Sequence, residues 1–255
     1  MIPEERRDKI LSLMRKNEVC SVKKLVSEFG VSRITIQRDL TMLEEAGLIA
    51  KVHGGARIVK QDGRVFETRF NIRFNQNYRK KLEIAKKAMA FIKPHGCIFI
   101  DSSTTGHVFG LEIFKHGVQD IVIVTNSPSL LHEAVQYPDQ KIISTGGELM
   151  RAFSMFAGEW VVDFLDKVNI DCAFISAAGV SKDLKVTTEN RELSRILEKV
   201  MQKSAEINLL IDSTKIYRQG MITVGHLSGC TRLITDEEAG QGPKGDFLRA
   251  GVEIA

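Results

Sequence analysis

The sequence predicts an α/β protein with an N-terminal winged helix-turn-helix, followed by a Rossmann-like domain built on a mostly parallel sheet. The first observation is charge: residues 1–93 hold 21 Lys and Arg against 11 Asp and Glu, whereas residues 94–255 hold 15 against 21. The second is a pair of short amphipathic helical patterns that meet at a glycine near the N-terminus. The third is the alternation of β-rich runs with helical patterns along the rest of the chain.

Three helical patterns occupy the first 47 residues. Pro3 suits the first position of the first helix, whose apolar stripe consists of Ile10, Leu11 and Met14. Ser21 is the expected N-cap of the second helix, and Gly30 is its expected C-terminal stop. Ser32 is the expected cap of the third helix, which ends at Gly47. Two helices joined by so tight a turn are typical of a helix-turn-helix.

Residues 48–59 form two strand-like runs around a Gly-Gly turn, which is the pattern of a wing. In a winged helix the start of the third helix enters the major groove, while the wing contacts the backbone or the minor groove. The basic charge of this part also favours a polyanionic partner. We therefore expect double-stranded DNA to contact Ser21, Ser32, Arg33, Ile34, Thr35, Gln37, Arg38, Lys51, His53 and Arg57. The alternative is a three-helix packing unit with a charged, solvated face.

The segment 60–80 is polar and basic, and we expect it to connect residues 1–59 to a second domain over residues 81–255. Phe66, Phe70 and Phe74 recur every four residues in it, which favours a docked helix over a flexible tether. Six β-rich runs predict the strands of the second domain, at 97–101, 121–125, 141–145, 171–176, 207–212 and 232–235. Helical patterns fill 82–93, 106–115, 128–136, 159–167 and 190–205.

Polar residues follow directly on four of these runs, at the strand ends where α/β sheets bind ligands. Hydroxyls, helix-start N–H groups and lysines suit a phosphate, whereas carboxylates and amides suit sugar hydroxyls. Each motif alone is more often a helix cap or a turn, and only their joint placement favours a site. Asp101 would repel a phosphate, so it is assigned to sugar hydroxyls, with Lys81 or Lys215 balancing its charge. The expected effector-binding residues are Lys81, Asp101, Ser102, Ser103, Thr104, Thr105, Asn126, Ser127, Gly146, Gly147 and Lys215.

Several other classes of protein are disfavoured, because the patterns typical of them are missing. The four cysteines and six histidines show no disulfide or metal-ligand spacing, so we expect free thiols, no metal and no cofactor. Neither a dinucleotide-binding nor a P-loop glycine signature follows a strand, and no serine lies in a nucleophile elbow. No apolar run approaches the roughly 20 residues of a membrane span. The charged start MIPEERRDKI has no signal-peptide core, so we expect a cytoplasmic protein without a membrane partner.

The run VSRITIQRDLTMLEEAGLIAKVHGGA, residues 31–56, resembles the DNA-binding signature of DeoR-type bacterial regulators. Gln37 stands where that signature usually has arginine. The second domain resembles the sugar-phosphate-sensing domain of the same regulators, itself related in fold to ribose-5-phosphate isomerase and glucosamine-6-phosphate deaminase. Ser103 replaces the glycine of the family's D-x-G-T-T pattern, and if that glycine has a positive φ, the loop must differ or be strained. The matching motifs are Lys81 with Ile84-Ala85, Asp101 with Thr104-Thr105, TNS (125–127), GG (146–147), DCAFI (171–175) and DSTK (212–215).

This resemblance implies a DNA-binding transcriptional regulator, expected to repress a carbohydrate-catabolism operon until a phosphorylated sugar or related metabolite binds. A homo-oligomer, dimer or tetramer, on palindromic operator DNA is expected. The alternative is a sugar-phosphate isomerase or deaminase with an appended DNA-binding head, in which Asp101 acts as the base and Glu189 or Glu192 approaches it. The related isomerases carry D-G-A-D-E where this chain has DCAFI, so both downstream carboxylates are absent. We therefore expect no enzyme.

Overall fold

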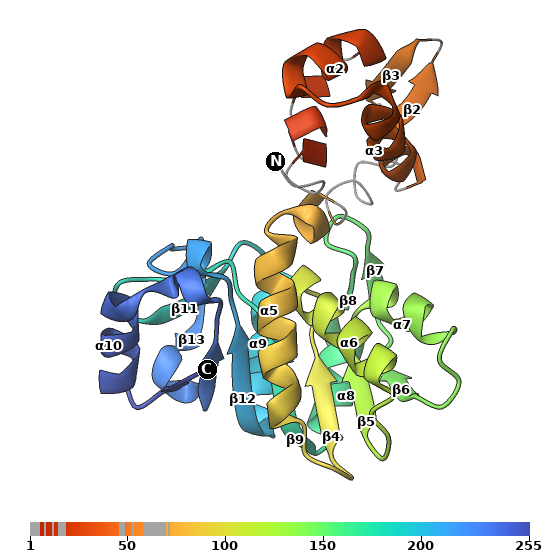
Figure 1. The fold of residues 1–255 in the computed structure, drawn as a ribbon. Coiled ribbons are helices and arrows are strands. Elements are labelled where there is room, and N and C mark those ends of the chain that lie inside the picture. The colour runs from red at the N-terminus through yellow and green to blue at the C-terminus, as the bar shows by residue number, and fades with distance from the viewer. Residues whose placement is uncertain are drawn as a thin grey trace. The chain divides into compact units, whose positions relative to one another are not determined.

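The computed structural model of the chain describes residues 6, 7, 9–11, 13, 14, 19–45, 49–52, 54–58, 70 and 72–255 (Figure 1). It divides into two compact units, residues 1–76 and 77–255, each of which is described by itself. The second unit therefore begins inside the segment expected to be the connector. Most of that segment lies outside the described residues, Phe66 included, while Phe70 and Phe74 stack with their ring centroids 6.3 Å apart.

The first unit is a helix-turn-helix with a three-stranded antiparallel sheet in the order β1-β3-β2. Its elements are β1 (Val19–Ser21), α2 (Val22–Phe29), α3 (Arg33–Glu45), β2 (Ile49–Val52) and β3 (Gly55–Ile58). Helical residues between positions 6 and 14 precede them. Ser21 caps α2 by accepting a hydrogen bond from the Lys24 amide at 3.2 Å, and Gly30 ends the helix at φ 62°, as the sequence predicts.

Strand β1 is not predicted by the sequence, because three residues are too few to show a period. It exists by pairing with β3, where Ser21 lies opposite Gly55. A Cβ atom at Gly55 would lie 2.3 Å from the Cys20 carbonyl oxygen, so only glycine allows the strands to approach this closely. Gly55, the second glycine of the predicted wing turn, thus also allows β3 to pair with β1.

A buried ion pair ties the N-terminal helical residues to α3. The Arg6 Nε lies 2.5 Å from Asp39 Oδ2, and both side chains are almost completely buried. Arg7 lies beside the pair, with its Nη1 3.7 Å from Asp39 Oδ1. Around it the apolar core consists of Ile10, Leu11, Met14, Cys20, Leu25, Ile36, Leu40, Leu43, Ile49 and Ala56. Apolar residues of all three helical segments therefore meet in one core.

The second unit is built on a seven-stranded sheet in the order β15-β14-β12-β9-β4-β5-β6, in which every neighbouring pair is parallel. The strands are β4 (Cys97–Ile100), β5 (Val122–Thr125), β6 (Lys141–Ser144), β9 (Ile170–Ile175), β12 (Ser204–Leu210), β14 (Arg232–Ile234) and β15 (Glu253–Ile254). The chain builds outward from β4 to β6 and then returns to the other side of β4. This Rossmann-type order places the topological switch point between β4 and β9.

Helices cover both faces of this sheet (Figure 1). They are α5 (Tyr78–Ala88), α6 (Thr104–His116), α7 (Pro128–Ala134), α8 (Glu159–Asp166), α9 (Arg191–Lys203) and α10 (Gln241–Arg249). On one face Phe109 of α6 packs on Phe174 of β9, with ring centroids 4.4 Å apart. On the other, Ile196 and Leu197 of α9 belong to the same buried cluster as Phe99. The first five of these helices and six of the seven strands match predicted segments, although α5 begins four residues earlier than expected.

The second unit also contains short elements that the sequence does not predict. A hairpin joins β7 (Glu148–Met150) to β8 (Met155–Ala157), and a second antiparallel sheet has the order β10-β11-β13. The strands of that sheet are β10 (Gly179–Val180), β11 (Lys185–Thr188) and β13 (Ile222–His226). Four 3₁₀ turns complete the unit: η1 (Met89–Phe91), η2 (Ser213–Lys215), η3 (Leu227–Gly229) and η4 (Glu237–Ala239). Among the described residues, no helix has the length and apolarity to cross a bilayer.

Candidate functional site

The start of α3 presents a polar and exposed surface in the first unit. The Ser32 hydroxyl caps the helix by accepting from the Thr35 amide at 3.1 Å, and its oxygen lies 2.9 Å from the Thr35 hydroxyl. Arg33, Gln37 and Arg38 are exposed, and Ile34 is 75% exposed. Guanidinium and amide groups suit base edges and phosphates, and an exposed aliphatic side chain suits a thymine methyl group. The helix therefore offers the chemistry of a recognition helix.

The wing residues differ from one another in what they can contact. Lys51 is held against the end of α3: its Nζ donates to Thr41 Oγ1 at 2.7 Å and lies 3.3 Å from Glu44 Oε2. The Lys51 backbone N–H also donates to Glu44, and this bond, the largest cause, lowers the pKa of that carboxyl. Arg57 is exposed on β3, whereas His53 lies outside the described residues. Ser21 is an exposed helix cap.

A second group of polar side chains lies at the switch point of the parallel sheet, around Asp101. Its Oδ2 accepts from the Ser176 amide after β9 at 2.8 Å, and its Oδ1 accepts from the Ser103 amide at 3.1 Å and hydroxyl at 2.5 Å. The side chain is 1% exposed, and this burial raises the pKa of Asp101, although the three hydrogen bonds and the Lys215 charge oppose the shift. The carboxylate therefore joins the loops after β4 and β9.

Ser103 fits the loop at the position where the family pattern has glycine. It is the N-cap of α6 at φ −71° and ψ 157°, an ordinary extended conformation, so the loop carries no strain at this position. Its hydroxyl accepts from the Gly106 amide at 2.9 Å while donating to Asp101. A Cβ atom at position 106 would lie 2.6 Å from Asp101 Oδ1, so the loop closes this tightly only around glycine. The serine therefore supports the loop with its side chain.

Two buried polar atoms beside this loop have no hydrogen-bond partner among the described residues. Thr105 Oγ1 lies in the first turn of α6, and Asn126 Oδ1 follows β5; both residues are 0% exposed. The Asn126 side-chain NH₂ donates to the Phe156 carbonyl at 3.2 Å and lies 3.5 Å from the Ser102 hydroxyl. A buried polar atom without a partner costs about 1–3 kcal/mol, so both atoms mark a place where a ligand would be stabilising.

The remaining strand-end candidates divide into structural and cationic residues. Ser127 caps α7 by accepting from the Leu130 amide at 3.2 Å, and Gly146 and Gly147 form an exposed turn with positive φ. The Lys215 Nζ donates to the Ala177 carbonyl at 2.9 Å, which places a positive charge beside the loop after β9. Lys81 lies in α5 and is 3% exposed.

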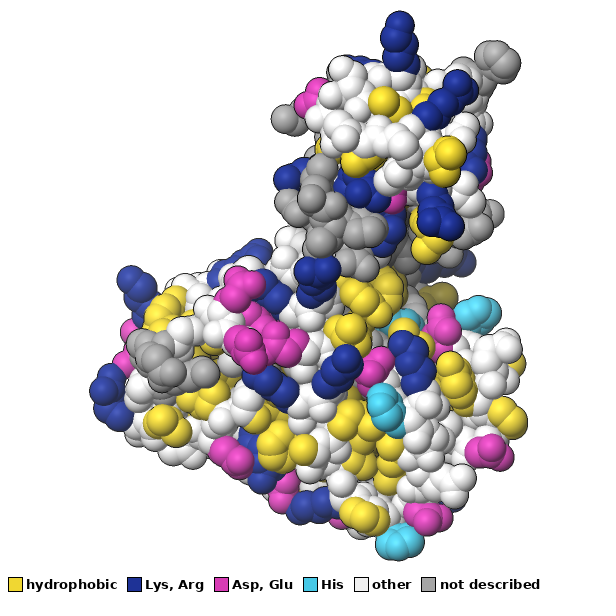
Figure 2. All heavy atoms as spheres, in the orientation of Figure 1, with side chains coloured by type: hydrophobic (Ala, Val, Ile, Leu, Met, Phe, Trp, Pro, Cys, Tyr) yellow, Lys and Arg dark blue, Asp and Glu magenta, His cyan; other side chains and the backbone are white. Residues whose placement is uncertain are grey.

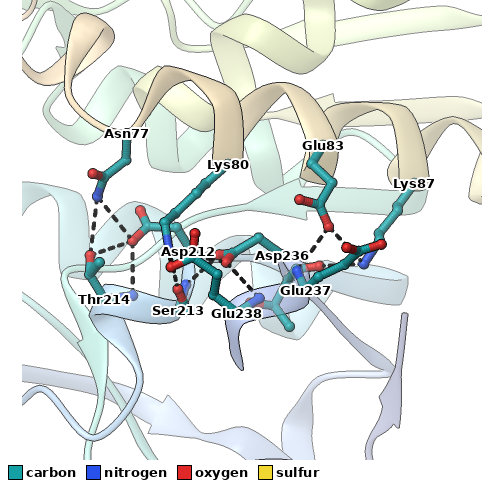
Figure 3. Close-up of polar contacts among 11 residues, drawn as sticks. Asn77, Lys80, Glu83, Lys87, Asp212, Ser213, Thr214, Asp236, Glu237 and Glu238 are labelled. Atoms are coloured by element: carbon teal, nitrogen blue, oxygen red, sulfur yellow. Dashed lines mark hydrogen bonds and ion pairs between the residues drawn. The ribbon is translucent and has the colours of Figure 1, made fainter. Parts of the chain in front are cut away.

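The sequence assigned no role in the site to Asn77, Lys80 or Asp236, which form hydrogen bonds between α5 and the loops after β12 and β14 (Figure 3). The bonds from α5 to these loops join residues more than 130 positions apart, so no local pattern indicates them. Within the described residues, no group of three or more metal-ligating side chains is placed to hold a metal ion.

The enzyme alternative finds little support in this geometry. Residues 171–175 lie in β9 with Phe174 and Ile175 fully buried, so no carboxylate projects where the isomerase motif would need one. Both Asp101 oxygens already accept hydrogen bonds, Glu189 is exposed, and Glu192 pairs with Arg195 at 3.7 Å. A proton-transfer base must reach its substrate's proton through a free lone pair, and the three accepted hydrogen bonds leave Asp101 only one such position.

Family models match both units. The model described as "DeoR-like helix-turn-helix domain" matches residues 6–62, and the model described as "DeoR C terminal sensor domain" matches residues 76–237. The chain is also 31% identical, over 100% of its own length and 98% of the relative's, to the HTH-type transcriptional regulator GlpR of Haloferax volcanii. The chain belongs to the DeoR family. It is a transcriptional regulator with a DNA-binding unit and a sensor unit.

Other relatives include both a repressor and an activator. The glycerol-3-phosphate regulon repressor of Escherichia coli is 28% identical over 91% of this chain and 90% of the relative. The L-fucose operon activator of the same species is 28% identical over 91% of this chain and 94% of the relative. The DeoR-family finding therefore supports a regulator over the enzyme alternative. Among solved structures, ribose 5-phosphate isomerase A of Methanocaldococcus jannaschii is 20% identical over 55% of each chain, with a TM-score of 0.40.

Proposed function

We propose that this regulator represses a carbohydrate operon by binding a palindromic operator, and that a phosphorylated sugar or polyol in the sensor unit relieves the repression. The observation that carries the sensor half is the pair of buried, unpartnered atoms, Thr105 Oγ1 and Asn126 Oδ1, at the switch point of the sheet. A phosphorylated ligand would supply hydrogen-bond partners for both atoms. Its phosphate would accept from Thr105 and the N–H groups at the start of α6, and a sugar hydroxyl would donate to Asn126.

The charges around the site suit such a ligand when each group has its own role. The Lys215 ammonium donates to the Ala177 carbonyl in the loop after β9, and it would turn from that carbonyl toward the phosphate. Asp101, which the sequence assigned to sugar hydroxyls, has one lone-pair position left after its three hydrogen bonds. Its proposed main role is therefore to shape the loop. The relatives' names support the ligand class, since one of them is a glycerol-3-phosphate regulon repressor.

The DNA half of the proposal rests on the exposed start of α3, where Arg33, Gln37 and Arg38 would reach base edges and phosphates. Arg57 of the wing would contact a phosphate, whereas the pairing of Lys51 with Glu44 weakens its expected contribution. Two copies of this helix on a two-fold operator require a homo-oligomer, which we propose to be a dimer or tetramer. Binding to operator DNA also implies that the protein acts in the cytoplasm.

A paired substitution tests the sensor site. Thr105→Val removes a hydroxyl that has no partner, so it should leave the melting temperature unchanged or raise it, while abolishing stabilisation by sugar phosphates in a thermal-shift screen. Thr235→Val is the matched control, because Thr235 Oγ1 is also buried and unpartnered but lies after β14. Operator binding, measured by fluorescence anisotropy, should persist in both variants. Equal responses to sugar phosphates in both variants, or none in the unmodified chain, would refute the assignment.

A further inference from the structure

A polar cluster joins the first turn of α5 to the loops after β12 and β14 (Figure 3). We call it the Lys80 cluster, and it has no role in the function proposed above. Its members are Asn77, Lys80, Asp212, Ser213, Thr214, Asp236 and Glu238.

Lys80 is the centre of the cluster. Its Nζ donates to Ser213 Oγ at 2.6 Å, to Asp236 Oδ1 at 3.2 Å and to Glu238 Oε2 at 2.7 Å, which uses all three donors of the ammonium. Asp236, 1% exposed, also accepts from the Ser213 amide at 2.6 Å and from the Glu238 amide at 3.2 Å. One lysine therefore holds two loops that belong to different strands.

Asn77 strengthens the connection at the start of the helix. It is the N-cap of α5, yet its side chain makes no capping bond, and its backbone is left-handed at φ 56°. The side-chain amide instead donates to Asp212 Oδ1 at 3.4 Å and to Thr214 Oγ1 at 3.3 Å. Asparagine is one of the few non-glycine residues that adopt this conformation readily, so its backbone ends the turn before α5 while its side chain remains available for η2. The first turn of α5 is thus fixed to η2 from outside the helix.

Apolar packing contributes to the docking of α5 on the sheet. Its buried face includes Ile84, Ala85 and Ala88, each 0% exposed, together with Lys81 at 3%. The Lys80–Asp236 pair, with side chains 16% and 1% exposed, adds a connection to two particular loops. Apolar packing does not account for the choice of these loops, which requires another reason.

That reason lies in what η2 carries. Its last residue is Lys215, whose ammonium donates to the Ala177 carbonyl and lies 3.3 Å from the Ser176 hydroxyl. The Ser176 amide in turn donates to Asp101 at the proposed effector loop. Hydrogen bonds joined by the covalent structure of Ser176 and η2 thus connect the switch point of the sheet to Lys80.

We propose that Lys80 and Asn77 are positioning residues that couple the effector site to the chain segment leading into the DNA-binding unit. A phosphate that draws Lys215 away from the Ala177 carbonyl shifts η2, and the Lys80 cluster transmits that shift to the first turn of α5. Helix α5 begins at Tyr78, immediately after the first unit ends at residue 76. This inference rests on the proposed function, because it explains how the two sites of that function affect each other.

Coupling between two binding sites is reciprocal, so operator DNA alone can test the inference without an identified effector. A duplex is first selected from a random library by the full-length protein. Amide hydrogen exchange is then measured by mass spectrometry with and without that duplex. In the unmodified chain, the duplex should change the exchange of residues 211–216 by about fivefold or more, the lower end of ordinary allosteric coupling.

Lys80→Met should still bind the duplex but lose the change at residues 211–216. Lys86→Met is the matched control, since it removes the same charge from an exposed position of the same helix and should behave as the unmodified chain. Asn77→Gly provides a second variant that keeps the fold, because glycine suits φ 56° and only the side-chain amide is lost. It should weaken the change at 211–216.

The outcomes separate the two proposals. Failure to select any duplex would refute the proposed operator binding, and with it the proposed function. A bound duplex that leaves residues 211–216 unchanged in the unmodified chain would overturn the coupling inference alone. The coupling inference is overturned as well if Asn77→Gly, or a folded Lys80→Met, shows the full change of the unmodified chain.

Discussion

Replacing Ser103 by alanine should destabilise the second unit more than replacing any serine that only caps a helix. The hydroxyl makes two bonds, one from the Gly106 amide and one to the buried Asp101 carboxylate. Loss of an N-cap costs about 1 kcal/mol, and loss of a hydrogen bond to a charged group costs about 1.5–3 kcal/mol. We therefore expect a loss of roughly 2.5–4 kcal/mol. For a unit of this size the melting temperature should fall by roughly 5–15 °C.

Ser127→Ala is the matched control, because Ser127 is buried and caps α7 through the Leu130 amide but bonds no carboxylate. It should cost only about 1 kcal/mol. Ser103→Gly should lie between the two, since a glycine cap is nearly as good as serine while the bond to Asp101 is still lost. Differential scanning calorimetry suits the assay because it can resolve the transitions of the two units. The only tryptophan, Trp160, is 80% exposed and would report unfolding poorly.

Equal shifts for Ser103→Ala and Ser127→Ala would refute this reasoning. They would mean that the bond to the Asp101 carboxylate contributes nothing, and that the cap accounts for the whole effect. A Ser103→Gly variant more stable than the unmodified chain would refute it in another way. Glycine would then be the better residue for the loop, as the family pattern at this position suggests.

Three further predictions concern the other buried and exposed charges. Arg6→Met leaves the Asp39 carboxylate buried without its main partner, so it should lower the stability of the first unit by about 3–5 kcal/mol and abolish DNA binding, while the second unit still melts normally. Adding Asp39→Leu should restore part of the lost stability. If calorimetry shows no recovery in the double variant, the loss is not due to a buried, unpaired charge. Gln37→Arg adds an exposed cation to α3, so the slope of log affinity against log salt should steepen by about 0.9 if it reaches a phosphate; an unchanged slope in anisotropy titrations would exclude that contact. Burial alone would raise the pKa of Asp236, but hydrogen bonds from Ser213 and Lys80 lower it below its ordinary value of 3.8. The contribution of Asp236 to stability is therefore present above pH 3.8 and lost as the pH falls below that value. Amide hydrogen exchange of residues 211–216, corrected for its intrinsic pH dependence, should not accelerate until then, and acceleration already at pH 6 would contradict this.

The sequence determined the division into a basic head and an acidic body, the helix-turn-helix and most of the parallel sheet. Those features rest on local signals: a cap or a glycine at each helix end, and apolar periods of 3.6 or 2 residues within each element. Ser21, Gly30 and Ser32 end or begin helices where the sequence places them. Unpredicted elements such as β1 and β15 have two or three residues each, and they exist through pairing with a distant partner.

The sequence also predicted part of the distribution of charge on the surface. Lysines and arginines recur over the first unit in Figure 2, as the count by sequence position implies. The sequence could not tell which of them are already engaged. Lys51 and Arg57 are both exposed basic residues of the wing, yet Lys51 pairs with Glu44, whereas no ion pair of Arg57 is found among the described residues.

The tertiary structure alone decided the roles of the residues at the strand ends. In the sequence, "DSSTTG" offers an acid and four equivalent hydroxyls; in the fold, Asp101 and Ser103 are bonded to each other and Thr105 is buried without a partner. The contacts of Lys80 and the burial of Lys81, which is 3% exposed, were decided in the same way. Which face of α5 meets the loops after β12 and β14 depends on pairings between strands far apart in the chain. Local periodicity fixes each element, whereas hydrogen bonds between elements are fixed only when the sheet order is formed.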